Sequence, residues 1–220
     1  MSTKDFLKKI KDEDIEYVDV RFTDTRGKLQ HVTIVSDLVD EDFIEEGFMF
    51  DGSSIAGWKS IEASDMKLML DTDTAYVDPF YAEKTICVHC SIVEPDTGEA
   101  YDRDPRGTAQ KAEAYLKSSG IGDTAYMGPE AEFFLFDNVK FSNTINKVSY
   151  EVDASDASWN SDTDYEMGNM GHRPGLKGGY FPVNPTDEAQ DLRAEMLSTM
   201  KRLGMKVDKH HHEVASCQHE

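Results

Sequence analysis

A dense run of turn-forming residues divides this chain near its middle. Pro95-Asp96-Thr97-Gly98 is followed closely by Asp102-Arg103-Asp104-Pro105-Arg106-Gly107. Proline, glycine and aspartate at this density interrupt helices and strands alike, so no regular element is expected to cross the segment. We therefore expect two domains, one over residues 1–103 and one over residues 104–220.

The part before this break predicts a small mixed sheet with a covering helix. Apolar and polar residues alternate with period two over 15–22 and over 29–35, which predicts a β-hairpin. The other elements expected here are a helix over 4–11, a helix over 38–46 capped by Ser36-Asp37 and closed by Gly47, strands over 66–70 and 85–93, and turns over 71–81. This mixture indicates an α+β fold class.

The part after the break predicts helices over 108–117 and 187–203, with Gly120 just past the first. Strands are expected over 130–136 and over 210–214. Residues 137–178 are polar and irregular, with weak strand character over 148–152.

Charge and composition exclude several classes of protein. Asp and Glu total 43 against 23 Lys and Arg, so the formal net charge is −20, which disfavours binding to nucleic acid or to an anionic membrane. No apolar run approaches the roughly 20 residues of a membrane span, and the N-terminus has no apolar stretch typical of a signal peptide. Three cysteines are too few for a disulfide scaffold, and Cys87 and Cys90 form only a lone C-x-x-C pair in a Val/Ile-rich strand. A cytoplasmic protein is expected, with most acids serving solubility.

Two acidic residues lead an aromatic row in Glu130-Ala131-Glu132-Phe133-Phe134. On a strand, Glu130 and Glu132 share one face, where two unpaired carboxylates repel each other. Mg²⁺ or Mn²⁺, which prefer oxygen ligands, would relieve that repulsion. The alternative is a strand end whose acids reach solvent.

A second candidate segment is His210-His211-His212-Glu213 through Glu220. On a strand, His211 and Glu213 share a face, and Glu213 and Glu220 add two carboxylates to the pair above. A lone His-rich strand is usually structural, but its coincidence with the paired glutamates favours a divalent-metal site.

Two loops are weaker candidates. Asp51-Gly52-Ser53-Ser54 is a common turn sequence, but it can also present Asp51 as an anionic or proton-accepting group. Gly178-Gly179-Tyr180-Phe181 can let the backbone approach a ligand closely.

Together these motifs resemble glutamine synthetase of the bacterial, class I type. Four of them occur in the family's order and approximate spacing: Phe50-Asp51-Gly52-Ser53-Ser54, Gly128-Pro129-Glu130-Ala131-Glu132-Phe133, Gly179-Tyr180-Phe181 and His210-His211-His212-Glu213-Val214-Ala215. The resemblance implies a ubiquitin-like β-grasp N-terminal domain followed by the start of an antiparallel-sheet catalytic domain. It also implies ATP-dependent ligation of ammonia to the γ-carboxylate of glutamate, through γ-glutamyl phosphate, in nitrogen assimilation.

The resemblance also implies roles for particular residues. Glu132, Glu213 and Glu220 correspond to ligands of one divalent metal, and Glu130 to a ligand of a second metal beside the ATP phosphates. The ammonium pocket corresponds to Asp51, Ser54, Tyr180 and Glu213. Asp208 lies where the family commonly has a nucleotide-contacting Glu, and Cys217 lies where many relatives have Gly.

The family assembles as two stacked hexameric rings, in which the Asp51 loop completes the catalytic sheet of a neighbouring subunit. The resemblance therefore implies a homo-oligomer whose substrates are glutamate, ammonium and ATP. The family's later motifs are absent, so we expect part of a longer subunit, inactive as a 220-residue chain. Ligation of another amine and a non-catalytic metal-binding fragment are the alternatives.

Overall fold

The computed structural model describes residues 1–159 and 173–220, so part of the segment expected to be irregular lies outside the described residues. The chain forms two compact units, unit 1 over Met1–Tyr126 and unit 2 over Met127–Glu220. The predicted boundary after residue 103 stays a prediction. No helix of the described residues is both long and apolar enough to cross a membrane.

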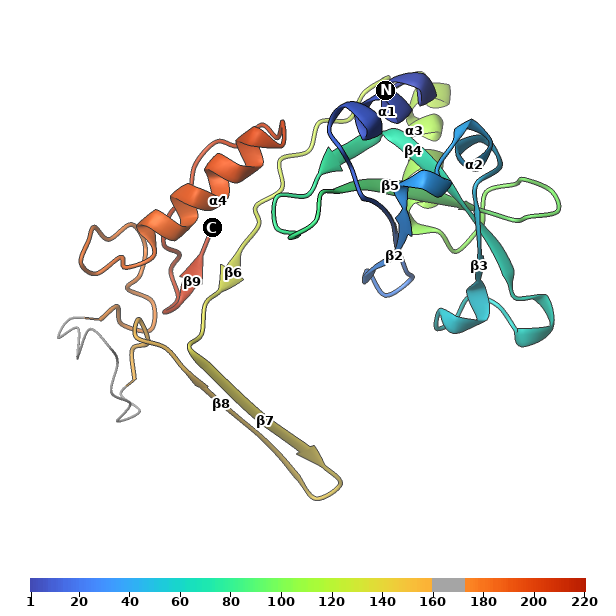
Figure 1. Cartoon of the computed structure of the whole chain (residues 1–220). Coiled ribbons are helices and arrows are strands. Elements are labelled where there is room, and N and C mark those ends of the chain that lie inside the picture. The colour runs from blue at the N-terminus through green and yellow to red at the C-terminus, as the bar shows by residue number, and fades with distance from the viewer. Residues whose placement is uncertain (160–172) are drawn as a thin grey trace. The chain divides into compact units, whose positions relative to one another are not determined.

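Unit 1 is built on a five-stranded sheet (Figure 1) in the order β2-β1-β5-β4-β3. Its strands are β1 (Tyr17–Thr23), β2 (Leu29–Val35), β3 (Phe48–Asp51), β4 (Asp65–Val77) and β5 (Thr85–Val93). Strands β1 and β5 pair in parallel and the other neighbours pair antiparallel. The expected hairpin is therefore confirmed, and the mixed sheet is that of a β-grasp domain.

An apolar core holds helix α1 (Thr3–Asp12) against this sheet. Phe6 and Ile10 lie one helical turn apart and are both buried. They join the buried side chains of alternate residues on the central strands, such as Val18 and Val20 on β1 and Ile86 on β5. Burial of each such side chain contributes about 1.5–3 kcal/mol to folding.

Three expectations for unit 1 were wrong in detail. Helix α2 (Glu41–Glu46) begins later than predicted, because Asp40 caps it by accepting from the Phe43 amide, while Ser36–Leu38 form a separate 3-10 turn. Strand β3 occupies the start of the expected loop. Strand β4 runs through the expected turns to Val77, with a register irregularity between Asp71 and Tyr76 that accommodates its polar residues.

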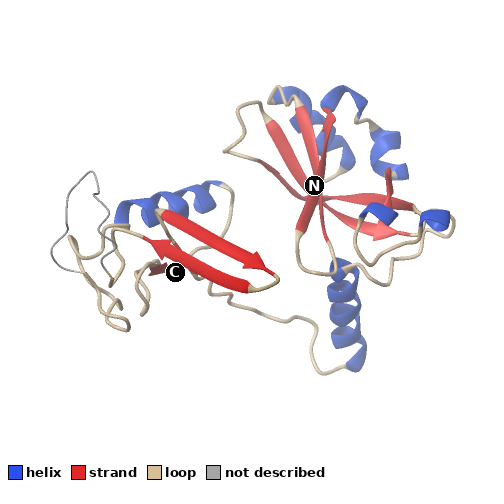
Figure 2. Cartoon of the chain, turned by 90° about the horizontal axis from the view of Figure 1, so that it is seen from below, coloured by secondary structure: helices blue, strands red, loops and turns tan. Residues whose placement is uncertain are grey.

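Helix α3 (Pro105–Ser119) follows the break and extends the prediction at both ends. Asp104 caps it by accepting from the Arg106 amide, Pro105 opens it, and Gly120 closes it in a left-handed conformation. Figure 2 shows α3 projecting from the sheet of unit 1. Gly107 is its only buried residue, so most of the helix is exposed.

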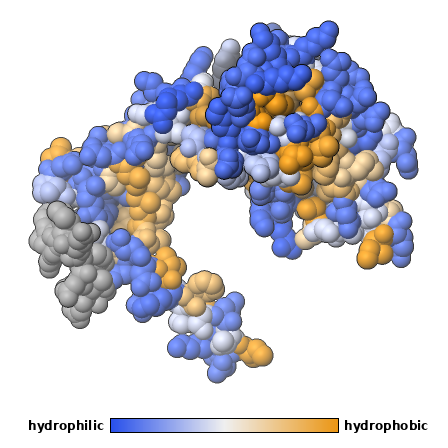
Figure 3. Space-filling view, in the orientation of Figure 1, coloured by the Kyte–Doolittle hydropathy of each residue, from blue (hydrophilic) through white to orange (hydrophobic). Residues whose placement is uncertain are grey.

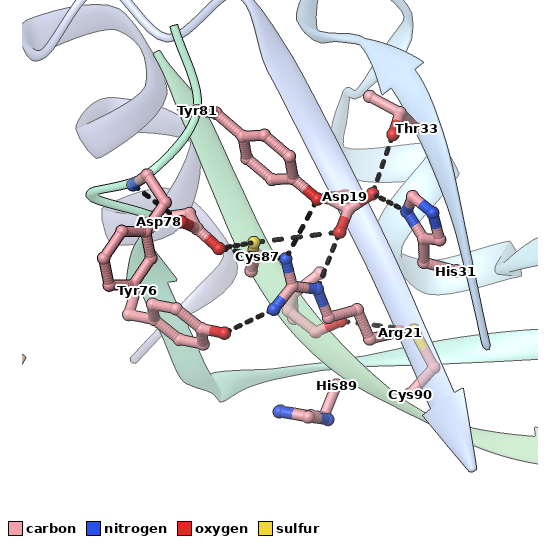
Figure 4. Close-up of polar contacts among 12 residues, drawn as sticks. Asp19, Arg21, His31, Thr33, Tyr76, Asp78, Tyr81, Cys87, His89 and Cys90 are labelled. Atoms are coloured by element: carbon pink, nitrogen blue, oxygen red, sulfur yellow. Dashed lines mark hydrogen bonds and ion pairs between the residues drawn. The ribbon is translucent and has the colours of Figure 1, made fainter. Parts of the chain in front are cut away.

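The face of the sheet that carries Asp19 is polar (Figure 4). Asp19 accepts from His31 Nδ1 and Thr33 Oγ1 on one oxygen and from Arg21 Nε on the other. Arg21 also donates to Tyr76 and Asp78. Beside them, burial raises the pKa of the Cys87 thiol to about 12 and that of the Cys90 thiol to about 12, so both buried cysteines are protonated at neutral pH, and their expected structural role stays a prediction.

Unit 2 has fewer regular elements. Strands β7 (Asn138–Thr144) and β8 (Lys147–Asp153) form an antiparallel hairpin, where only weak strand character was predicted. The helix expected over 187–203 is α4 (Gln190–Arg202). The strand expected over 130–136 shrinks to β6 (Phe133–Phe134), which pairs antiparallel with β9 (Gln218–His219), a strand that was not predicted. Residues 210–214 form only an isolated bridge, between His212 and His219.

Candidate metal-binding site

The site lies within unit 2, where the Glu130–Glu132 segment meets the segment from His211 to Glu220. Residues His211 to Glu220 fold back as a hairpin, because His211 and Glu220 exchange two backbone hydrogen bonds of 3.1 Å, and Glu213 N donates to Gln218 O at 2.8 Å. We call residues 211–220 the ligand hairpin. Strand β9 lies in one arm of it and pairs with β6, so Phe133 lies opposite His219.

This pairing brings together carboxylates that are far apart in the sequence. Oxygen atoms of Glu130, Glu132 and Glu220 lie within 4.8 Å of one another. Gln218 Nε2 donates to Glu132 Oε2 at 2.7 Å and so fixes the orientation of that side chain. Glu130 and Glu132 precede β6 instead of lying on a strand, so the reason given for their shared face was wrong, although they do converge.

A second group of donors shares Glu220 with the first. Ligand atoms of His211, Glu213 and Glu220 also lie within 4.8 Å of one another. His211 Nδ1 is 3.4 Å from Glu213 Oε1, and His211 Nε2 is 3.1 Å from Glu220 Oε2. His211 and Glu213 therefore lie together as expected, although the strand that was given as the reason is not formed, and Glu213 groups with His211 and not with Glu132.

The donor chemistry fits a divalent cation. His211 Nδ1 faces the carbonyl oxygen of His212 at 3.1 Å, so this nitrogen donates. In a neutral ring, Nε2 then carries a lone pair, and it is buried without a hydrogen-bond partner while it faces the Glu220 carboxylate. A cation between His211 Nε2 and the Glu220 carboxylate would be a partner for both groups. The donors around it are mostly carboxylates, which suits Mg²⁺ or Mn²⁺.

Buried polar groups support the ligand hairpin. His212 Nε2 donates to Asp156 Oδ2 at 2.9 Å, and the same oxygen accepts from Cys217 N at 2.8 Å. Burial lowers the pKa of His212, but the hydrogen bonds to Asp156 and to the Glu213 carbonyl more than offset this, so the pKa is raised. The ring is therefore held by acceptors on both of its nitrogens.

Helix α4 contributes a second support through Arg193, which is buried. Arg193 donates to Asp187 Oδ2 at 2.5 Å and to His219 Nδ1 at 2.8 Å, and its Nε faces His210 Nδ1 at 3.3 Å. Burial, with the charges of His212 and Arg193, lowers the pKa of His219 to about 4, so its ring is neutral near pH 7. Burial raises the pKa of Asp187, but Arg193 more than offsets this and lowers it.

The aromatic residues of the glycine loop lie against His211. Tyr180 is half-exposed, stacks on Phe181 with ring centroids 3.9 Å apart, and meets the His211 ring edge-on at 5.4 Å. At Gly179 a Cβ would lie 2.6 Å from the Glu213 carbonyl oxygen. The glycine is therefore required for close approach of this loop to the ligand hairpin.

Asp51 lies in unit 1, at the end of β3, and is exposed. Its Oδ1 accepts from the Ser53 hydroxyl at 2.6 Å and the Ser53 amide at 2.8 Å, and the Ser54 hydroxyl lies 3.3 Å from Oδ2. The Ser53 hydroxyl and amide, followed by weaker contributions from Ser54, lower the pKa of Asp51, so it is anionic at neutral pH. Sequence reasoning singled out Ser54 and overlooked the closer contact with Ser53.

Asp208 is exposed, between α4 and the ligand hairpin. Cys217 is buried and adopts φ 65°, the left-handed region that favours glycine, which explains why glycine suits this position. Sequence reasoning left out Asp156, Arg193 and His211 as site residues. Only His211 had a usable signal, in its alternation with Glu213.

Each of the two parts of the chain matches a known protein family. The family described as "Glutamine synthetase, beta-Grasp domain" matches residues 14–95, and "Glutamine synthetase, catalytic domain" matches residues 102–220. The curated glutamine synthetase of Cereibacter sphaeroides is 76% identical over 216 residues, which are 98% of this chain and 46% of that protein. That of Rhodobacter capsulatus is 72% identical over 219 residues, which are 100% of this chain and 50% of that protein.

Solved structures agree on the fold. The cryo-EM structure of Plasmodium falciparum glutamine synthetase superposes with a TM-score of 0.86 at 24% identity, covering 100% of this chain and 43% of that one. A GmaS/ADP complex gives a TM-score of 0.68 at 17% identity, covering 98% and 43%. The chain thus spans about half the length of the curated relatives it matches, and it belongs to the glutamine synthetase family.

Proposed function

We propose that this chain supplies part of the active site of a longer glutamine synthetase subunit. The reaction is the ATP-dependent ligation of ammonia to the γ-carboxylate of glutamate, in which phosphorylation of the carboxylate precedes displacement by ammonia. The observation that carries the proposal is the convergence of Glu130, Glu132, Glu213 and Glu220 in a member of this family.

The ligand roles are those that the family resemblance implies. Glu132, Glu213 and Glu220 would hold one Mg²⁺ or Mn²⁺, and Glu130 would contribute to a second. Glu220 supports this proposal because it is the carboxylate shared by the two donor groups. Divalent cations neutralise phosphate oxygens and fix the geometry of phosphoryl transfer. The backbone pairing of the ligand hairpin holds two of these carboxylates, and Gln218 orients Glu132.

Ammonium binding is proposed for Asp51, Ser54, Tyr180 and Glu213. The hydrogen bonds from Ser53 and Ser54 keep Asp51 anionic, as a group that attracts NH₄⁺ must be. A positioned carboxylate can also accept a proton from ammonium and release ammonia for attack. Asp208 is proposed to contact ATP.

Assembly into two stacked hexameric rings in the cytoplasm is part of the same proposal. The hairpin of β7 and β8 supports an assembly, because Phe141, Ile145 and Tyr150 on it are each more than 80% exposed. Figure 3 shows hydrophobic atoms at this hairpin. Exposed apolar side chains on one element are typical of a surface that contacts another protein.

The activity is tested in a hybrid subunit in which this chain replaces the matching part of the Cereibacter sphaeroides glutamine synthetase. We expect ATP-dependent formation of γ-glutamyl hydroxamate, and a loss of about 100-fold or more in the Asp51→Asn hybrid, as for removal of a general base. A folded hybrid with no activity would contradict the proposal. Turnover with methylamine equal to that with ammonium would favour the alternative amine.

The second candidate is a non-catalytic metal-binding chain, because both donor groups lie within unit 2. It predicts Mn²⁺ binding without ATP hydrolysis. Calorimetry on Glu132→Ala and Glu213→Ala tests the ligands for either function, and unchanged Mn²⁺ affinity in both variants would refute the assignment.

A further inference from the structure

The ligand hairpin is tied to a buried carboxylate that comes from a distant part of unit 2. Asp156 follows β8 and is 8% exposed. Its Oδ2 accepts one hydrogen bond from His212 Nε2 at 2.9 Å and another from Cys217 N at 2.8 Å. His212 lies on one arm of the hairpin and Cys217 at the start of the other, so one oxygen atom connects both arms.

The same contacts fix the backbone beside the ligands. His212 Nδ1 donates to the carbonyl oxygen of Glu213 at 2.7 Å, so the ring joins Asp156 directly to the backbone of a proposed ligand. On the other arm, Cys217 is held at φ 65°, and the turn it closes leads through β9 to Glu220. The two bonds to Asp156 therefore add to the backbone pairing between the arms in setting the separation of Glu213 from Glu220.

Without a cation, the Glu213 and Glu220 carboxylates on the two arms repel each other, and this repulsion favours separation of the hairpin arms. The hydrogen bonds to Asp156 form before the ion binds, so they oppose this separation and reduce the conformational ordering that metal binding requires. Partners behind metal ligands typically change metal affinity by 10–100-fold.

We propose that Asp156 is a positioning residue for the carboxylate cluster, acting through His212 and the Cys217 amide to hold the ligand hairpin in its metal-binding shape. The proposal rests on the proposed metal site. It predicts that Mn²⁺ affinity falls when the acceptor oxygen of Asp156 is removed and recovers when an acceptor is restored.

The test is Mn²⁺ titration of the chain by calorimetry, with electron paramagnetic resonance of the bound ion. We expect Asp156→Ala to weaken Mn²⁺ binding by about tenfold and to broaden the Mn²⁺ signal, with the far-ultraviolet circular dichroism unchanged. Asp156→Asn keeps an oxygen that can accept both hydrogen bonds, so its affinity should lie within about threefold of the parent chain. A purely structural role would leave the signal of the bound ion unchanged.

The matched control is Asp104→Ala. Asp104 is 1% exposed, so it is at least as buried as Asp156, and it accepts from the Ile92 and Arg106 amides. It lies in unit 1, so its loss should leave Mn²⁺ affinity unchanged. If Asp156→Ala does not fold, His212→Asn decides the question, because it breaks the same bond from the other end and should weaken Mn²⁺ binding equally. Parental affinity and an unchanged signal in the folded variant would overturn the positioning role.

Glu220→Gln separates this inference from the proposed function. Loss of Mn²⁺ binding in Glu220→Gln with parental binding in Asp156→Ala would overturn only the role of Asp156. Parental binding in Glu220→Gln would overturn the metal site, and the positioning role with it.

Discussion

The two units bury different kinds of side chain. In unit 1 most buried residues are hydrophobic and form one cluster that runs from Phe6 to Tyr101, with a few buried polar residues such as Asp19 and Asp104. In unit 2 the buried hydrophobic residues of the described part are Ala154, Ala157 and Cys217, whereas charged and polar side chains such as Asp156, Arg193 and His212 are fully or almost fully buried. Unit 1 is thus stabilised mainly by nondirectional apolar burial, and unit 2 by hydrogen bonds that require particular geometry.

This difference has a functional consequence. An apolar core tolerates substitutions of similar volume, so the core side chains of unit 1 can vary while the Asp51 loop keeps its position. A buried polar network is stable only when each member has its partner, which specifies one arrangement of the ligand hairpin. The predictions below test whether the two units respond to substitution in these two ways.

The largest effect is expected for Arg193→Met. It leaves the Asp187 carboxylate buried without its ion-pair partner and removes the donor to His219. Breaking a buried pair by removing one member typically costs about 3–5 kcal/mol. Hydrogen exchange with mass spectrometry should show lost protection in α4 and β9 but not in β1 or β5.

Arg202→Met is the control on the same helix. Arg202 is exposed, and its side-chain hydrogen bond among the described residues is the one it donates to Thr199 Oγ1. We expect Arg202→Met to change the free energy of unfolding by no more than about 0.5 kcal/mol. Equal exchange in the two variants would contradict the view that the buried network stabilises unit 2.

Leu68→Ala is the corresponding test of the apolar core. Leu68 is fully buried on β4, and truncation of a buried leucine costs about 2–5 kcal/mol. Protection should fall across β4 and β5 and remain in α4. Leu38→Ala removes the same atoms from a leucine that is 64% exposed and should change little, whereas equal effects of the two truncations would contradict the role of the core.

The elements of unit 1 could be predicted from the sequence better than those of unit 2. The reason is again that unit 1 is stabilised by apolar burial and unit 2 by hydrogen bonds. Period-two alternation located β1, β2 and β5, because apolar side chains on one face mark a strand locally. Strand β3 was missed because it is short and runs into Gly52, and β4 was cut short because Asp71 and Thr72 continue it without apolar alternation.

The candidate site shows the same limit. Glu130, Glu132, Glu213 and Glu220 could be selected because they lie in recognisable motifs, and the structure brings them into two groups that share Glu220. Asp156 could not be selected, because its local sequence Ser155-Asp156-Ala157 is ordinary. Its importance comes from contacts with His212 and Cys217, which are more than 50 residues away.

Acid should destabilise unit 1 through Asp19, a fully buried carboxylate on β1. Burial raises the pKa of Asp19, but hydrogen bonds from His31, Arg21 and Thr33 more than offset this, so the pKa is lowered. The resulting stability is present above the unfolded pKa, about 3.9, and is lost as the pH falls through the lower folded pKa.

The measurement is urea unfolding between pH 7 and pH 3 in a Trp159→Phe background, where Trp58 fluorescence reports on unit 1. Asp19→Asn should be less stable at pH 7 and show a shallower decline below pH 4. An unaltered decline would assign the acid sensitivity to other carboxylates.

The smallest effect, and the sharpest test of the geometry of unit 2, concerns Cys217. Its positive φ costs an L-residue about 1–2 kcal/mol, whereas its buried Sγ packs with Ala154 and Ala157. Cys217→Gly relieves the backbone strain and loses the packing of Sγ, so the free energy of unfolding should change by less than about 1 kcal/mol.

Cys217→Ala loses the sulfur and keeps the strain, so we expect it to be less stable than Cys217→Gly. At ordinary core positions the order is the opposite, because the smaller side chain is the less stable one. Thermal unfolding with and without Mn²⁺ measures both variants, and both should still bind the ion because neither removes a ligand. If the alanine variant were the more stable, packing of the side chain would outweigh backbone geometry here, and the contrast between the two units would weaken.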